Sequence, residues 1–184
     1  LKMNSKVYIE RFLGEKIKKY LKTKEIIAIV GARQCGKTTL MMHIFDSLKN
    51  AKFISFEDRE ILGLFTQDIK SFIELYINGT DYLFIDEFHY AKKGGKQLKY
   101  IYDSFNTKII ISGSSSQDLS IQSIKYLVGR IFVFELYVLS FEEYLRYIDN
   151  KLYNLYAKGK FSQPLIEKIN NYYKEFIIYG GYPR

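Results

Sequence analysis

The sequence predicts an α/β fold in which a five-stranded parallel β-sheet is covered by helices. Three observations lead to this prediction. Short apolar runs alternate with segments of helical periodicity between residues 25 and 150. The first apolar run leads into a loop with two glycines, and a later one ends in two adjacent carboxylates. Since parallel strands bring their carboxyl ends to one edge of the sheet, where ligands bind in such folds, we expect these features to meet there.

The expected elements follow one another along the chain. Residues 4–22 have apolar positions at helical spacing and lysines over much of the other face, which is typical of an amphipathic helix. The five strands are expected at Glu25–Val30, Lys52–Phe56, Asp81–Asp86, Lys108–Ser112 and Ile131–Leu136. Helices are expected at Lys37–Leu48, Asp68–Ile77, Lys96–Phe105 and Ser120–Val128. A further helix should begin after Ser140, since Glu143 stands at the spacing of a capping box.

These patterns divide the chain into three parts. Residues 1–24 form a basic helical segment, residues 25–150 the α/β core, and residues 151–184 a helical extension. Within the extension, residues 151–164 are polar and tyrosine-rich, which favours a flexible crossing, and Leu165–Tyr179 has the pattern of a helix. The closing GGYPR resembles an entry into further structure, so we expect a C-terminal region that this sequence does not contain.

Composition excludes some classes of protein. With 184 residues and 47% hydrophobic content the chain can bury one sizeable core, and no apolar run approaches the ~20 residues of a membrane span. No signal-peptide pattern precedes the first strand. Cys35 is the only cysteine, so an intrachain disulfide is impossible and a reducing compartment is favoured. We therefore expect a cytoplasmic protein that does not associate with membranes.

The net charge of +8 is unevenly distributed. Residues 1–24 hold eight Lys or Arg against two Glu, and a second cluster follows the third expected strand. The second cluster consists of Lys92, Lys93, Lys96 and Lys99. Such clusters could contact the phosphates of a nucleic acid, or they could be solvated helix faces.

The loop GARQCGKT matches G-x-x-x-x-G-K-[ST] at every fixed position. Gly31 and Gly36 let the backbone come close to an anion, so that its N–H groups can point at phosphate oxygens. Lys37 supplies charge to the β- and γ-phosphates, and the Thr38 hydroxyl can ligate Mg²⁺. The helix that follows points its positive N-terminal end at the same phosphates. Other residues expected to contact the nucleotide are Ala32, Arg33, Gln34, Cys35 and Thr39.

Two further sets of polar residues end expected strands. Asp86 can hold Mg²⁺, and Glu87 can orient or deprotonate the water that attacks the γ-phosphate. Ser112 and Ser114 follow the next strand, where either could sense the γ-phosphate, although serines that cap a turn would look the same. His89 could relay contact with a bound polymer, but a histidine on the surface or one that only supports a site residue is the simpler interpretation.

The set GARQCGKTTL, LFIDEFHYA, IIISGSSS, LVGRIFVFELYVLSFEEYL and YGGYPR closely resembles the AAA-domain ATPases of archaea and bacteria. These belong to the AAA+ superfamily of P-loop NTPases. The resemblance covers about Ile26 to Arg184 and implies a three-layer sandwich with strand order 5-1-4-3-2, which binds ATP with magnesium. It also implies winged-helix-like and nuclease-like C-terminal regions in full-length members, which are absent here.

The resemblance also implies a role for Arg130. The Gly-Arg pair before the fifth strand recurs in the family, so Arg130 is a candidate phosphate sensor or trans-acting arginine finger. A structural ion pair with an acid such as Glu135 or Glu142 is the alternative. Superfamily members often form rings in which one subunit's arginine reaches its neighbour's nucleotide, so a homo-oligomer is conceivable.

Three functions are compatible with these features. The leading hypothesis is an ATPase that couples its nucleotide cycle to the rearrangement of a partner, conceivably DNA. The second is a nucleotide-binding switch with little or no turnover of its own. The third, a small-molecule kinase, is disfavoured by Glu87 and by the lack of a recognisable acceptor-binding lid.

Overall fold

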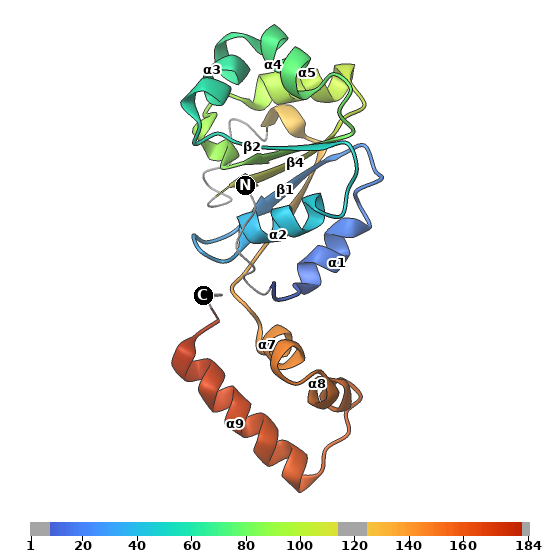
Figure 1. The fold of residues 1–184 in the computed structure, drawn as a ribbon, viewed down its shortest axis with the longest axis vertical. Helices are drawn as coiled ribbons and strands as arrows, with labels where there is room; N and C mark the ends of the chain where they lie inside the picture. Colours follow the sequence, from blue (N-terminus) through green and yellow to red (C-terminus); the bar gives the residue numbers. More distant parts are fainter. Residues whose placement is uncertain (1–7, 114–124, 182–184) are drawn as a thin grey trace.

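The computed structural model of the chain describes residues 8–113 and 125–181 (Figure 1). Its centre is one parallel sheet of five strands in the order β2-β3-β4-β1-β5. The strands are β1 (Ile26–Val30), β2 (Ala51–Ser55), β3 (Tyr82–Asp86), β4 (Lys108–Gly113) and β5 (Ile131–Glu135). The predicted fold class and strand order are therefore confirmed, because 5-1-4-3-2 is the same order counted from the other edge.

Helices cover both faces of the sheet. Alternate residues of β1 point to opposite sides: Ile26 and Ala28 belong to one apolar cluster, and Ile27 and Ile29 to the other. The first cluster packs against α3 (Arg59–Gln67), α4 (Ile69–Tyr76) and α5 (Gly95–Ser104). The second packs against α1 (Phe12–Lys18) and α2 (Lys37–Phe45). Because β1 is buried on both faces, its sequence IIAIV shows no polar alternation.

The N-terminal helix is shorter than the sequence pattern predicts. Helix α1 begins at Phe12, and Arg11 before it has an extended backbone. The first amide of the helix, the N–H of Phe12, donates to the Glu143 carboxylate at 2.8 Å. A distant side chain thus caps the helix here. Residues 4–7 of the predicted helix lie outside the described part of the chain.

Two helices form where none was expected. Asp58 caps α3 by accepting hydrogen bonds from the amides of Glu60 and Ile61. Asp149 caps α8 (Asn150–Ala157) by accepting from the Leu152 amide at 3.0 Å, so the flexible crossing expected at residues 151–164 is largely helical. Of the helix expected at Ser120–Val128, residues 120–124 lie outside the described residues and Lys125–Leu127 form the 3₁₀ turn η2.

The C-terminal helices lie beyond one end of the sheet and its flanking helices (Figure 1). They are α7 (Phe141–Ile148), α8 and α9 (Gln163–Tyr179). Helix α7 begins with the predicted capping box of Ser140 and Glu143. The Phe141 ring packs against Tyr173 and Phe176 of α9, and the Leu139 amide donates to the Gly181 carbonyl at 2.7 Å. None of the helices in the described residues is long and apolar enough to cross a membrane.

A buried lysine at the start of β4 makes stability depend on pH. Lys108 is only 6% exposed, and its Nζ donates to the backbone carbonyls of Thr23 and Glu25. Burial lowers the pKa of Lys108 from 10.5 to about 8, and the nearby Glu25 carboxylate opposes this shift. Between these two pH values the unfolded chain binds more protons than the folded chain. The free energy of unfolding should therefore rise with pH across that window.

Lys108→Met should remove this rise. As the pH increases from 8 to 10.5, the free energy of unfolding of the wild type is expected to rise by up to about 3 kcal/mol more than that of the variant. Urea unfolding of both proteins at several pH values in this window measures the difference between their free energies of unfolding. The contributions of all other titrating groups are common to both proteins and cancel in this difference. An equal rise in both proteins would show that Lys108 is not the group responsible.

Candidate functional site

The glycine loop joins the buried end of β1 to the first turn of α2. Leu136, just after β5, donates its amide to the Val30 carbonyl at 2.7 Å, so β5 ends directly against the start of the loop. A Cβ on Gly31 would lie 2.1 Å from the Leu136 carbonyl oxygen. Gly36, the N-cap of α2, has a φ of 97°. Both glycines of the motif are thus required by the backbone itself.

Lys37 is held along this loop. Its side chain is almost buried, and its Nζ donates to the carbonyls of Gly31 at 2.9 Å and Ala32 at 2.8 Å. Cys35 is fully buried beneath the loop. The loop residues that face solvent are Ala32, Arg33 and Gln34, and Thr38 and Thr39 are exposed in the first turn of α2. A cation, the free amides of a helix N-terminus and an accessible loop surface together favour binding of a phosphate group.

A chain of hydrogen bonds links α2, β3 and β4 beside the loop. The Thr38 hydroxyl donates to Asp86 Oδ2 at 2.7 Å, and the Ser112 hydroxyl donates to Asp86 Oδ1. Ser112 also accepts from the Glu87 amide at 3.0 Å. Asp86 and Ser112 are buried, so each holds the other in one orientation. Phosphate sensing by Ser112 stays a prediction, and Ser114 lies outside the described residues.

These oxygen donors suit a magnesium ion. Mg²⁺ prefers hard oxygen ligands and is usually held by one or two carboxylates together with substrate phosphates and water. The Thr38 hydroxyl and the Asp86 carboxylate already lie in contact at the end of the loop, so they are the residues that would hold it. Among the described residues, no three or more His, Cys, Asp or Glu side chains lie close enough together to hold a metal ion by themselves. Mg²⁺ that binds with a nucleotide does not require such a group, because phosphates and water supply most of its ligands.

Glu87 projects from a tight turn after β3. Its φ of 54° is left-handed, and the 3₁₀ turn η1 (Phe88–Tyr90) follows it. His89 Nδ1 lies 2.9 Å from Glu87 Oε2, although the angles are not those of a hydrogen bond. The contact is therefore an ion pair whenever the imidazole is protonated. The sequence left a polymer contact, a surface position and a supporting position next to the site open for His89, and the two-residue spacing was the one signal for the contact with Glu87.

Arg130 lies at the opposite edge of the sheet. Its carbonyl accepts a hydrogen bond from the amide of Ile26, the first residue of β1. The glycine loop follows Val30, the last residue of the same strand. The Nε of Arg130 donates to Asp103 at 3.0 Å, so Arg130 forms the structural ion pair that was the alternative, but with Asp103 and not with Glu135 or Glu142. Strand β5 separates Arg130 from the loop by roughly 15 Å at about 3.3 Å per residue. The structure therefore does not bring Arg130 to the loop of its own chain, and a role in trans stays a prediction.

Comparisons with known proteins agree with this geometry. A family model described as an AAA domain matches residues 23–145, about two thirds of the chain. An uncharacterized protein of Haemophilus influenzae is 31% identical over 95% of the chain and 43% of its own length. The uncharacterized protein MJ1544 of Methanocaldococcus jannaschii is 32% identical over 86% of the chain and 36% of its own length. The chain thus spans less than half the length of these relatives.

Solved structures share the fold at low sequence identity. The Walker-type ATPase PABY2304 of Pyrococcus abyssi has a TM-score of 0.60 and 15% identity, over 96% of the chain and 65% of its own. Domain III of the Thermotoga maritima replication initiation protein DnaA has a TM-score of 0.56 and 16% identity, and the match covers 82% of this chain and 72% of that domain. Aquifex aeolicus DnaA bound to AMPPCP has a TM-score of 0.54 and 15% identity, and the match covers 90% of this chain and 60% of the DnaA chain.

Proposed function

Because the chain belongs to the AAA-domain family of P-loop ATPases, we propose that it binds ATP with magnesium and hydrolyses it. The observation that carries the proposal is the meeting of Lys37, Thr38 and Asp86 at one end of β1 and β3, with Glu87 directly after Asp86. AMPPCP, an ATP analogue, is bound by the similar DnaA of Aquifex aeolicus, which supports ATP as the ligand.

In this proposal each part of the site has one task. The loop amides and Lys37 bind and orient the phosphates. Magnesium, when bound with the nucleotide, would neutralise charge that develops on them. Asp86 and Thr38 are the residues that would hold the ion. Glu87, in the left-handed turn directly after β3, positions the attacking water and accepts its proton.

Glu87→Gln should separate hydrolysis from binding. The amide keeps the size of the side chain but cannot accept the proton, so we expect kcat to fall about 100-fold or more while ATP affinity is retained. The experiment measures magnesium-dependent ATP turnover and binding of labelled ATP by both proteins. Glu74→Gln, which changes an exposed acid on α4, is the matched control and should behave like the wild type.

Two outcomes would change the proposal. If the wild type binds ATP but neither protein turns it over, hydrolysis by this chain is wrong and the alternative of a binding switch is supported. If the wild type fails to bind ATP, the nucleotide site itself is wrong.

A nucleic acid is our candidate for the partner. Lys92, Lys93 and Lys96 are exposed on and before α5, and the Lys96 ammonium lies over the Tyr126 ring at 5.6 Å. Basic side chains beside aromatic rings are typical of surfaces that bind single strands. Of the N-terminal cluster, Arg11 is buried in an internal ion pair and is not available. Similarity to a replication initiation protein also favours such a partner.

Replacing Lys92, Lys93 and Lys96 together by Gln should weaken binding to single-stranded DNA. Each phosphate contact that is lost should reduce the slope of log K against log salt by about 0.7. Fluorescence anisotropy of labelled DNA at several salt concentrations measures this slope. Wild-type binding that does not weaken as salt increases would contradict the phosphate contacts.

A further inference from the structure

We propose that Arg11 is a positioning residue of the phosphate loop and that Glu143 of α7 holds it in place. Arg11, whose backbone is extended, is the last residue of the segment 8–11 before α1, which we name the strap and which runs between the core and α7. The inference deepens the proposed function, since it concerns the shape of the same loop.

Arg11 connects three parts of the chain that are far apart in sequence. Its Nη1 donates to the Cys35 carbonyl at 2.9 Å, and its Nη2 donates to the Tyr137 carbonyl at 2.6 Å. Its Nε donates to Glu143 Oε2 at 3.0 Å. The guanidinium is only 6% exposed. The guanidinium is a planar fork that donates from three separate nitrogens in fixed directions, whereas the three donors of a lysine all leave one nitrogen at the end of a flexible chain.

The contact with Cys35 fixes part of the loop that we expect to face phosphate. Cys35 is followed by Gly36 and then by Lys37. In a planar trans peptide the C=O and the following N–H point in opposite directions, and the described peptides are all trans. Arg11 holds the Cys35 carbonyl on its own side, so the Gly36 N–H must point the other way. Arg11 therefore sets the direction of one loop amide without touching a ligand.

Glu143 in turn is fixed from several sides. Besides Arg11 it accepts from the Phe12 amide at 2.8 Å and from the Ser140 amide at 3.0 Å, the latter as part of the capping box of α7. Its side chain is 6% exposed. The same carboxylate therefore caps two helices and neutralises the buried Arg11, which makes the start of α7 the support for the loop.

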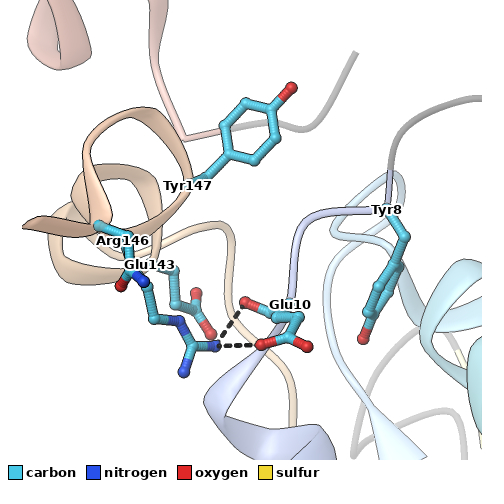
Figure 2. A pocket seen from close by; sticks show the side chains of 6 residues that line it. Tyr8, Glu10, Glu143, Arg146 and Tyr147 are labelled. Atoms are coloured by element: carbon cyan, nitrogen blue, oxygen red, sulfur yellow. Dashed lines mark hydrogen bonds and ion pairs between the residues drawn. The ribbon is translucent and has the colours of Figure 1, made fainter.

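Polar contacts dominate the join between the strap and α7. A cavity of about 270 Å³ lies between them, with Tyr8 and Glu10 on one side and Glu143, Arg146 and Tyr147 on the other (Figure 2), and Asn150 lines it too. Arg146 crosses it to the carbonyl and carboxylate of Glu10, which is largely exposed. Beside this cavity, the buried Arg11–Glu143 pair connects α7 directly to the Cys35 carbonyl of the loop.

The reactivity of Cys35 provides a direct measurement of loop order. It is the only cysteine in the sequence, and its side chain is fully buried under the loop. Alkylation by iodoacetamide therefore requires the loop to open. Arg11→Lys keeps the positive charge beside Glu143 but loses the fork, and Glu143→Gln keeps the shape of the cap but loses the charge. Both variants should be alkylated about tenfold faster than the wild type, as expected for loss of a buried hydrogen bond.

Lys168→Gln is the matched control. It breaks an ion pair with Asp149 in the same group of C-terminal helices, far along the chain from the strap, and should leave the alkylation rate unchanged. Rates that match the wild type in both Arg11→Lys and Glu143→Gln would overturn the proposal. A rise that follows the denaturant dependence of global unfolding would overturn it too, because the effect would then be general destabilisation.

A second arm adds ATP and magnesium to the same reaction. ATP should slow alkylation of the wild type, and about tenfold more ATP should be needed for the same protection of Arg11→Lys. If ATP gives the wild type no protection, the proposed function is wrong. The alkylation rates measured without nucleotide still test whether Arg11 orders the loop. If ATP protects the wild type and Arg11→Lys equally well, Arg11 does not position the loop for its ligand.

Discussion

Gly31→Ala is expected to lower the free energy of unfolding by about 3 kcal/mol, the upper end of the usual cost of overpacking, and to abolish measurable ATP binding. The added Cβ would lie 2.1 Å from the Leu136 carbonyl oxygen and 3.0 Å from Cys35 Sγ. Neither neighbour can move freely, since Leu136 is hydrogen-bonded to Val30 and Cys35 is fully buried. The start of the loop must therefore shift, and Lys37, which is bonded to the Gly31 carbonyl, shifts with it.

Gly63→Ala is the control for this substitution. Gly63 lies inside α3 with nothing within 4 Å of the position of a Cβ, so alanine there should stabilise the protein by about 0.5–1 kcal/mol. Urea unfolding and binding of labelled ATP are measured for both variants. If Gly31→Ala unfolds and binds like Gly63→Ala, the close approach of β5 to the loop does not constrain the site.

Local features of the sequence were sufficient to predict the strands and the loop, whereas the strand order came from the resemblance to the AAA-domain ATPases. Each strand is a short apolar run, and the loop is a contiguous motif with a strand before it and a helix after it, so no long-range information was needed. Helix α3 was missed because its apolar positions are interrupted by Gly63, which weakens a helical pattern, while its cap at Asp58 could have been noticed. Helix α8 is likewise started by a carboxylate, Asp149.

The contacts that sequence analysis missed join residues far apart in the chain. Arg11 was counted with a basic surface and Glu143 with a helix cap, but they are 132 residues apart and form one buried pair. Nothing local to either residue indicates its partner. For Arg130 the sequence left a phosphate contact and a structural ion pair open, and the structure shows an ion pair with Asp103. A residue directly before a parallel strand lies at the amino edge of the sheet, so the predicted topology already separated Arg130 from the loop.

Phe56→Ala is expected to cost about 4 kcal/mol of the free energy of unfolding, the usual range for truncating a buried phenylalanine. The Phe56 side chain is 1% exposed, and its ring centroid lies 4.9 Å from that of Phe65 and 5.6 Å from that of Phe88. Phe132→Ala, on the edge strand β5 where the side chain is 36% exposed, is the control and should cost about 1 kcal/mol. Urea unfolding of the two variants and the wild type gives both values.

The same substitution tests how Glu87 is held. Phe88 follows Glu87 directly, so a cavity beside the Phe88 ring should let the turn move and lower kcat about tenfold or more. The Phe56 amide would still donate to the Asp86 carbonyl at 3.0 Å, so binding should change less than turnover. Phe56→Leu fills most of the cavity and should restore much of kcat. If Phe56→Ala loses stability but keeps kcat, the polar contacts of the Glu87 amide with Ser112 and Asp86 are sufficient to hold the turn, and the aromatic cluster serves the core alone.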